Sequence, residues 1–142
     1  MNSLSLNQAQ AIISEALAAA RDKGYKPMGV VVVDAAAQAI AFAREDGASA
    51  LRLDIAYGKA GAAIGMGVSS RALAVRAKDM PAFFGTIATN AQQPFIPQTG
   101  AVLITNAQGE IVGAVGASGG TGDEDEEIVI AGISAAGLHH LS

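Results

Sequence analysis

A run of β-branched residues, MGVVVVD over Met28–Asp34, sets the strongest limit on the fold. The run is short and apolar up to its final aspartate, and Pro27 precedes it. This pattern is typical of a central strand that is buried on both faces. Ala39–Arg44 (AIAFAR) predicts a second strand, so that Asp34–Gln38 forms the turn of a β-hairpin.

A second hairpin is predicted near the end of the chain. Its strands are expected over Gly100–Thr105 and Glu110–Ser118. Asn106–Gly109 between them places a glycine where the turn needs a positive φ.

Helical patterns surround the two hairpins. Ser5 and Gln8 form a capping box, after which apolar residues recur at helical spacing until Gly24. Small residues in a second helix, among them Gly58 and Gly61, allow a close backbone approach. The further helices are predicted over Leu51–Gly65, from Ser69 or Ser70 to Asp79, over Pro81–Ala88 and over Asp123–Leu138. The order of elements predicts an α+β fold with a mainly antiparallel, single-layer sheet flanked by helices.

The composition is that of one folded domain over residues 1–142. The chain is 51% hydrophobic and 15% charged, which excludes disorder. It has no cysteine, so disulfides, thiolate nucleophiles, zinc–thiolate sites and iron–sulfur clusters are excluded. No apolar run reaches the about 18 residues of a membrane span, and the start MNSLSLNQAQ does not resemble a signal peptide. We therefore expect no membrane contact and a cytoplasmic location.

The net charge of −4 is unevenly distributed, since all nine lysines and arginines lie within residues 1–78. So few basic residues predict no nucleic-acid binding, because phosphate contacts supply most of that affinity. The uneven charge is compatible with head-to-tail self-association, or with acidic residues that share one solvated face.

A glycine-rich segment, GAVGASGGTG over Gly113–Gly122, precedes the last predicted helix. It matches neither the dinucleotide-binding fingerprint nor the P-loop. The acidic residues at 123–127 already complement the helix dipole and would repel a phosphate. We favour a tight strand-to-helix turn, with the acids on a solvated face rather than around a cation. Gly119 and Gly120 still allow a neutral or metal-bearing ligand to approach the backbone.

Charged residues gather after the first hairpin. Arg44, Glu45 and Asp46 lie at its end, and Lys59 lies on the following helix. Arg44 and Asp46 project to the same side if the strand continues. Such charges beside a helix of small residues suit a clamp for a ligand carboxylate. A structural ion pair of Asp46 with Arg44 or Lys59 is the alternative, and both stay open.

No metal site is predicted. The two histidines, His139 and His140, lie near the chain end, where we expect fraying. Without another histidine or a cysteine, neither a histidine-based triad nor a zinc site is expected. Some side chains could ligate an iron but are explained more simply as core or surface residues: Met28, Met66, Met80, Tyr25 and Tyr57.

A set of short motifs runs in order along nearly the whole chain. They are VVD at 32–34, AREDGA at 43–48, IA at 55–56, KA at 59–60, GASGGT at 116–121, DE at 125–126 and AG at 131–132. Together they resemble the GlcG/HbpS-like family, which also includes the C-terminal domain of PduO-type proteins. The resemblance implies a profilin-like α+β fold, homo-oligomers and, in some members, binding of haem or a corrinoid.

The resemblance also implies which residues lie near a pocket or an oligomer interface. They are Arg44, Asp46, Lys59, Gly119, Gly120 and Thr121. The chain departs from the family at residues 35–37, where AAA replaces a usually glycine-rich turn, and at 100–103, where GAVL replaces a Gly-Gly-x-Pro pattern. It also lacks the internal histidine that haem-binding members can use.

Three functions follow from these residues. The first is a small-molecule-binding protein for haem or another tetrapyrrole, in which Arg44 and Lys59 meet the ligand carboxylates. The second is an accessory catabolic enzyme, an isomerase or hydrolase of a small organic acid, with Asp46 as general base and Arg44 as carboxylate clamp. The third is a structural oligomer whose charged residues only stabilise an interface.

Overall fold

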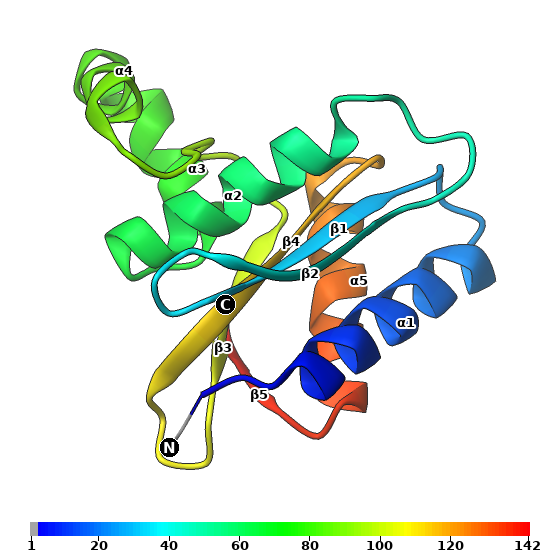
Figure 1. The fold of residues 1–142 in the computed structure, drawn as a ribbon. Helices are drawn as coiled ribbons and strands as arrows, with labels where there is room; N and C mark the ends of the chain where they lie inside the picture. The colour runs from blue at the N-terminus through cyan, green and yellow to red at the C-terminus, as the bar shows by residue number, and fades with distance from the viewer. Residues whose placement is uncertain (1–2) are drawn as a thin grey trace.

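The computed structural model describes residues 3–142. Its strands form one five-stranded sheet in the order β2-β1-β4-β3-β5, and every neighbouring pair is antiparallel (Figure 1). The elements are α1 (Leu6–Asp22), β1 (Gly29–Asp34), β2 (Ala39–Arg44), α2 (Arg52–Met66), α3 (Ser70–Asp79), α4 (Pro81–Asn90), β3 (Ala101–Thr105), β4 (Ile111–Ser118), α5 (Gly122–Ala135) and β5 (His139–Leu141). The α+β prediction is therefore confirmed. Within residues 3–142, no helix is long and apolar enough to cross a membrane.

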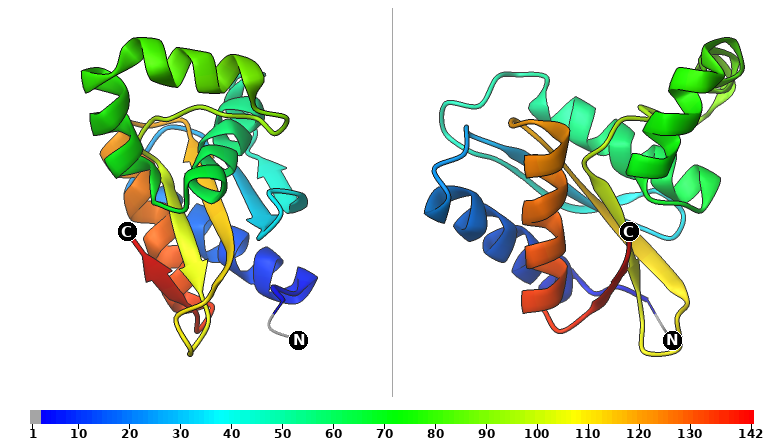
Figure 2. Two further views of the ribbon diagram at one scale, coloured as in Figure 1. Left: turned by 90° about the vertical axis from the view of Figure 1, so that its left-hand side faces the viewer. Right: turned by 180° about the vertical axis from the view of Figure 1, so that it is seen from behind.

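Helices cover both faces of this sheet (Figure 2). Along β1, Val30 and Val32 join the core formed with α1 and α5, whereas Val31 and Val33 pack against α2. The two sets alternate because successive side chains of a strand point to opposite faces. β1 lies between β2 and β4 and is buried over its first five residues, which confirms the predicted central strand. The arrangement is consistent with the profilin-like description.

Glycines on α2 let an irregular segment, residues 91–99, lie directly on the helix; we call this segment the strap. A Cβ at Gly58 would lie 2.5 Å from the side chain of Ile96, and one at Gly61 would lie 2.2 Å from the carbonyl oxygen of Pro94. The Ile96 N–H donates to the Gly58 carbonyl at 2.9 Å. The predicted close approach is therefore confirmed, and its partner is the strap.

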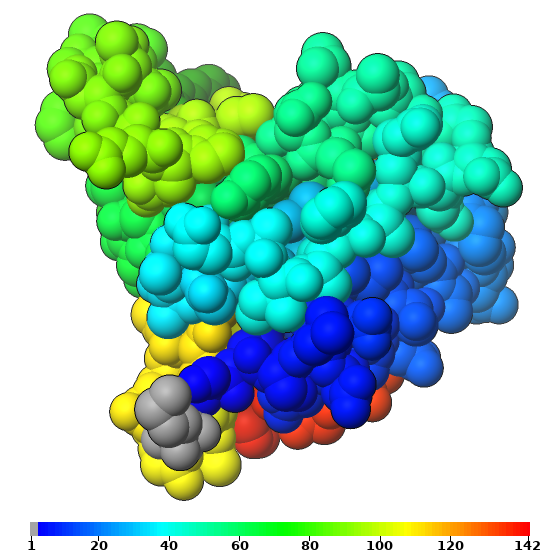
Figure 3. Space-filling view, viewed as in Figure 1, coloured from blue at the N-terminus to red at the C-terminus, as the bar shows by residue number. Residues whose placement is uncertain are grey.

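α3 and α4 form an arm that stands out from the body of the molecule (Figure 3). Phe84 of α4 is buried against Leu73 of α3 and Ala62 of α2. Most of α4 faces solvent, including Phe83, which is 54% exposed. The arm thus presents apolar surface outside the core.

The predicted C-terminal end of the last helix is wrong. α5 ends at Ala135 rather than Leu138, because Gly137 adopts a φ of +78° and turns the chain. His139–Leu141 then forms β5 on β3, where fraying was expected. The hydroxyl of Ser69 donates to the Leu141 carbonyl. Ser69 thus occupies the N-cap position of α3, but its hydroxyl bonds to β5 and does not cap the helix.

Candidate functional site

A hollow of about 500 Å³ opens where the start of α2, the end of β4 and the start of α5 meet. We call it the Arg52 hollow. Its lining residues are Arg52, Ile55 and Lys59 of α2, Gln98 and Thr99 of the strap, Ser118 of β4, and Gly120, Thr121, Gly122, Asp123 and Asp125 around the start of α5. Their side chains are mainly polar, so the hollow suits a polar or charged group.

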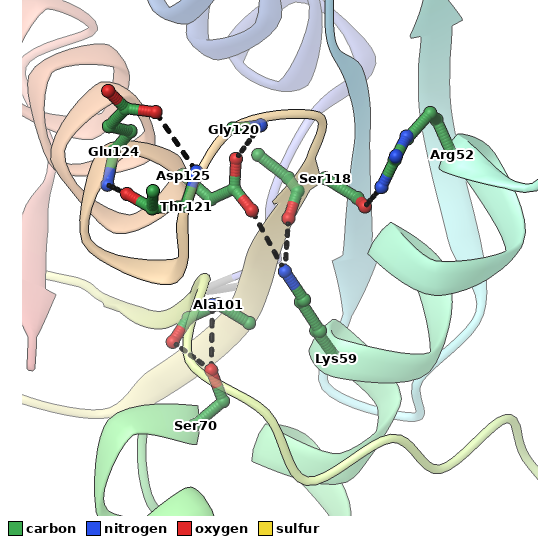
Figure 4. Close-up of polar contacts among 10 residues, drawn as sticks. Arg52, Lys59, Ser70, Ala101, Ser118, Gly120, Thr121, Glu124 and Asp125 are labelled. Atoms are coloured by element: carbon green, nitrogen blue, oxygen red, sulfur yellow. Dashed lines mark hydrogen bonds and ion pairs between the residues drawn. The ribbon is translucent and has the colours of Figure 1, made fainter. Parts of the chain in front are cut away.

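Lys59 and Asp125 form a buried ion pair in the wall of this hollow (Figure 4). Lys59 Nζ lies 3.0 Å from Asp125 Oδ2 and also donates to the Ala117 carbonyl at 3.0 Å. The side chains are only 7% and 2% exposed. Burial raises the pKa of Asp125, and the Lys59 ammonium opposes that rise. The pair joins α2 to α5, and its positive charge is already neutralised.

Backbone N–H groups at the turn into α5 donate to side chains of the same segment. The Gly120 N–H donates to Asp125 Oδ1 at 2.9 Å, and the Thr121 N–H donates to Glu124 Oε1 at 2.9 Å. The Glu124 N–H in turn donates to Thr121 Oγ1 at 3.2 Å, which completes a capping box. These acceptors occupy the positions where a phosphate cradle would need free N–H groups. The prediction of a tight turn without a phosphate cradle agrees with this geometry.

Arg52 is the cation of the hollow that forms no ion pair within residues 3–142. Its Nη1 donates to Ser118 Oγ at 3.1 Å. The two residues meet because Gly29 pairs with Ser118 across β1 and β4, and a Cβ at Gly29 would lie 2.9 Å from the Arg52 carbonyl carbon. A guanidinium carries five N–H donors, so Arg52 retains donors for a ligand.

The strap closes another side of the hollow. Gly100, directly after the strap, adopts a φ of +135°, and a Cβ there would lie 2.7 Å from Lys59 Nζ. A Cβ at Gly122 would lie 2.9 Å from Thr99 Cβ. Both glycines therefore permit the close packing that brings Thr99 beside the turn into α5.

The residues predicted from the sequence divide between two places. Lys59, Gly120 and Thr121 line the Arg52 hollow. Gly119 is not among its lining residues, and a Cβ there would meet the Pro27 carbonyl oxygen at 2.3 Å. Arg44 and Asp46 line a different hollow of about 450 Å³, together with Arg21, Pro27 and Glu45. We call this the Asp46 hollow. The two hollows share no lining residue.

In the structure, the two cations that were considered as partners of Asp46 have other partners. Lys59 pairs with Asp125, and Arg44 Nη1 donates to the Ala48 carbonyl at 2.7 Å. No ion pair of Asp46 occurs in the described part of the chain. The alternative of a structural ion pair of Asp46 with Arg44 or Lys59 is therefore wrong.

Sequence reasoning missed Arg52, Ser118 and Asp125. Asp125 was assigned to a solvated acidic face, yet it is 1% exposed. A signal existed, because Asp125 precedes the buried Ile128 and Val129 of α5 by three and four residues. That spacing places its carboxylate on the inner face of the helix. No comparable local signal distinguishes Arg52 or Ser118.

None of the residues that line the Arg52 hollow has a side chain that commonly ligates a haem iron. Met28 is buried in the core with α1 and α5. The Tyr25 hydroxyl donates to Glu127, and the Tyr57 hydroxyl donates to the Ala37 carbonyl. The two histidines are exposed on β5. Among the residues that the structure describes, no group of three or more His, Cys, Asp or Glu could hold a metal ion.

The fold and this polar hollow define an α+β protein with an open ligand-sized site. The chain belongs to the HbpS-like family: the family described as "Haem degrading protein HbpS-like" matches residues 4–134. The resemblance stated from the sequence motifs is thereby confirmed. No curated protein sequence matches the chain.

Three solved structures illustrate the similarity. A PduOC:haem complex is 22% identical, covers 99% of both chains and gives a TM-score of 0.86. HbpS is 27% identical over 94% of this chain and 90% of its own, with a TM-score of 0.82. A double mutant of HbpS from Streptomyces reticuli is 30% identical over 99% of this chain and 90% of its own, with a TM-score of 0.83.

Proposed function

We propose that this protein binds a small molecule that carries a carboxylate, with haem as the first candidate, in the Arg52 hollow. The single observation behind the proposal is that Arg52 faces the hollow without a carboxylate partner in residues 3–142. Lys59 is neutralised by Asp125, and Asp123 is engaged by Arg71. Arg52 is therefore the cation at the hollow that forms no ion pair within residues 3–142.

The neighbouring groups suit the same ligand. Ser118 and Thr99 supply hydroxyl groups, and Gln98 supplies an amide. Arginine binds carboxylates through two parallel hydrogen bonds, which gives both strength and orientation. A carboxylate at Arg52 would thus find a charge partner together with neutral donors.

Haem is favoured among such ligands by the family and by the relative that was solved with haem. The lining fits the carboxylates of haem, because Arg52 is available for a propionate. It does not fit the iron, since none of the lining residues is a His, Cys, Met or Tyr. A corrinoid carries mainly amide side chains, so Arg52 favours haem over a corrinoid.

The test is a titration of the purified protein with hemin, followed by absorbance. Arg52→Gln removes a charge-assisted pair worth about 1.5–3 kcal/mol, so the dissociation constant should rise about 10- to 100-fold. Arg44→Gln in the Asp46 hollow is the matched control and should change it less than about twofold. Equal affinities of the unaltered protein and Arg52→Gln would contradict the proposal, and no saturable binding of hemin would exclude haem as the ligand.

An enzyme is the second candidate, and the Asp46 hollow is the observation that favours it. Arg44 and Asp46 line it together, as a carboxylate clamp and a general base would require. The test incubates the protein with small keto and hydroxy acids in deuterated water and follows α-proton exchange by NMR. Exchange that disappears in Asp46→Asn supports the enzyme, and exchange that is absent or persists in Asp46→Asn excludes it.

We also propose that the protein is a homo-oligomer and is cytoplasmic. Support for the first comes from α4, a helix without any charged residue that is mostly exposed. Size-exclusion chromatography with light scattering should give a mass that is a multiple of the chain mass, 14.2 kDa. A monomeric mass would contradict the oligomer.

A further inference from the structure

We propose that the ligand extends beyond the Arg52 hollow and crosses Thr99 onto the face of α3. Its class is then an amphipathic carboxylate, with an apolar body too large for the Arg52 hollow alone. This inference rests on the proposed function and specifies its ligand.

A second hollow of about 510 Å³ adjoins the Arg52 hollow. We call it the α3 hollow; it is lined by Arg71, Ala74, Val75, Ala77 and Lys78 of α3, with Gln98 and Thr99 of the strap. Gln98 and Thr99 line both hollows, so the two share a wall.

An ion pair also joins the two hollows. Arg71 lines the α3 hollow and Asp123 lines the Arg52 hollow, and Arg71 Nη2 contacts Asp123 Oδ1. Arg71 Nη2 also lies 3.0 Å from Glu126 Oε1. These ion pairs link α3 to α5 through their side chains. Because Gln98 and Thr99 line both hollows, one molecule can contact both.

The two hollows differ in chemistry. The Arg52 hollow offers a cation with hydroxyl groups, whereas Ala74, Val75 and Ala77 give the α3 hollow an apolar wall. Val75 is 60% exposed, although a branched apolar side chain gains free energy when it leaves water. Lys78 stands at this wall without an ion pair in the described chain. A flat or elongated apolar body with two carboxylates would match both cations and the wall between them.

The experiment compares a large probe with a short one. Protoporphyrin IX, which carries no metal, has an apolar body and two carboxylates, and its binding is followed by fluorescence. Succinate has two carboxylates without that body, and its binding is followed by calorimetry. Because neither probe contains iron, axial ligation does not affect the comparison.

Val75→Glu places a negative charge on the apolar wall and should weaken protoporphyrin binding at least about tenfold. It should change succinate binding less than about twofold. Phe42→Glu is the matched control, because Phe42 is an equally exposed apolar residue on β2, outside both hollows, and it should change neither affinity. Arg52→Gln should weaken both probes.

The outcomes separate this inference from the proposed function. Unchanged protoporphyrin binding in Val75→Glu, or binding of succinate without protoporphyrin, would overturn the extended site and leave the proposed function intact. Unchanged binding of both probes in Arg52→Gln would overturn the proposed function and this inference together, as would a failure of the unaltered protein to bind either probe.

Discussion

Replacement of Asp125 by asparagine tests the buried ion pair of the site most severely. The new amide would keep an oxygen that accepts from the Gly120 N–H but would leave Lys59 as a buried cation without its counter-charge. Removal of one partner of a buried pair costs about 3–5 kcal/mol. The unfolding entropy of a 142-residue chain is roughly 0.3 kcal/mol/K, so the melting temperature should fall by about 10–17 °C.

The assay is thermal unfolding followed by circular dichroism, with a urea titration for the free energy of unfolding. Asp123→Asn is the control, because Asp123 belongs to the same acidic run but its side chain is 81% exposed. An exposed pair is worth about 0–1 kcal/mol, so this variant should melt within about 3 °C of the unaltered protein.

A double variant separates the ion pair from other effects of Asp125. Lys59→Met with Asp125→Asn removes both charges, so it should be more stable than Asp125→Asn alone. A melting temperature that falls by less than about 3 °C in Asp125→Asn would refute the reasoning, as would simple additivity of the two single changes in the double variant.

Three further changes have defined outcomes. Ser70→Ala removes a buried hydroxyl that bonds the backbone of β3 at 2.8 and 3.2 Å, and a urea titration should show a loss of about 1–3 kcal/mol in stability. Gly61→Ala should lower the melting temperature, because the new methyl group would meet the strap at 2.2 Å; an unchanged value would contradict this packing. Glu127 has a pKa below its ordinary value of 4.5, because Lys23 and Tyr25 donate to its carboxylate. Its stabilisation is therefore present above about pH 4.5 and lost as the pH falls through the lowered pKa. In urea titrations, Glu127→Gln should be less stable than the unaltered protein at about pH 6, and the difference should shrink as the pH falls below about 4.5.

Elements with local signals could be predicted from the sequence. The capping box of Ser5 and Gln8, the buried run of β1 and the positive φ of Gly109 each depend on residues only a few positions apart. Such signals survive folding because the backbone chemistry that produces them is local. The end of α5 was predicted wrongly because β5 depends on pairing with β3, which no local pattern indicates.

The candidate site could be predicted only in part. Lys59 was identified, but its partner Asp125 lies 66 residues away, and the two meet through the packing of α2 and α5 on either side of the end of β4. β1 pairs with β2, its neighbour along the chain, and also with β4. The pairing with β4 brings Ser118 close to Arg52. Both contacts depend on the order of the strands in the sheet. The sequence patterns that predict the two hairpins do not determine that order. Arg44 and Lys59, expected in one pocket, consequently line different hollows.

A crystal structure of the protein with protoporphyrin IX is the most direct test of the central claim. We predict a carboxylate oxygen within about 2.7–3.2 Å of the Arg52 guanidinium, with the macrocycle across Thr99. A porphyrin bound elsewhere, with the Arg52 hollow open to solvent, would contradict the account.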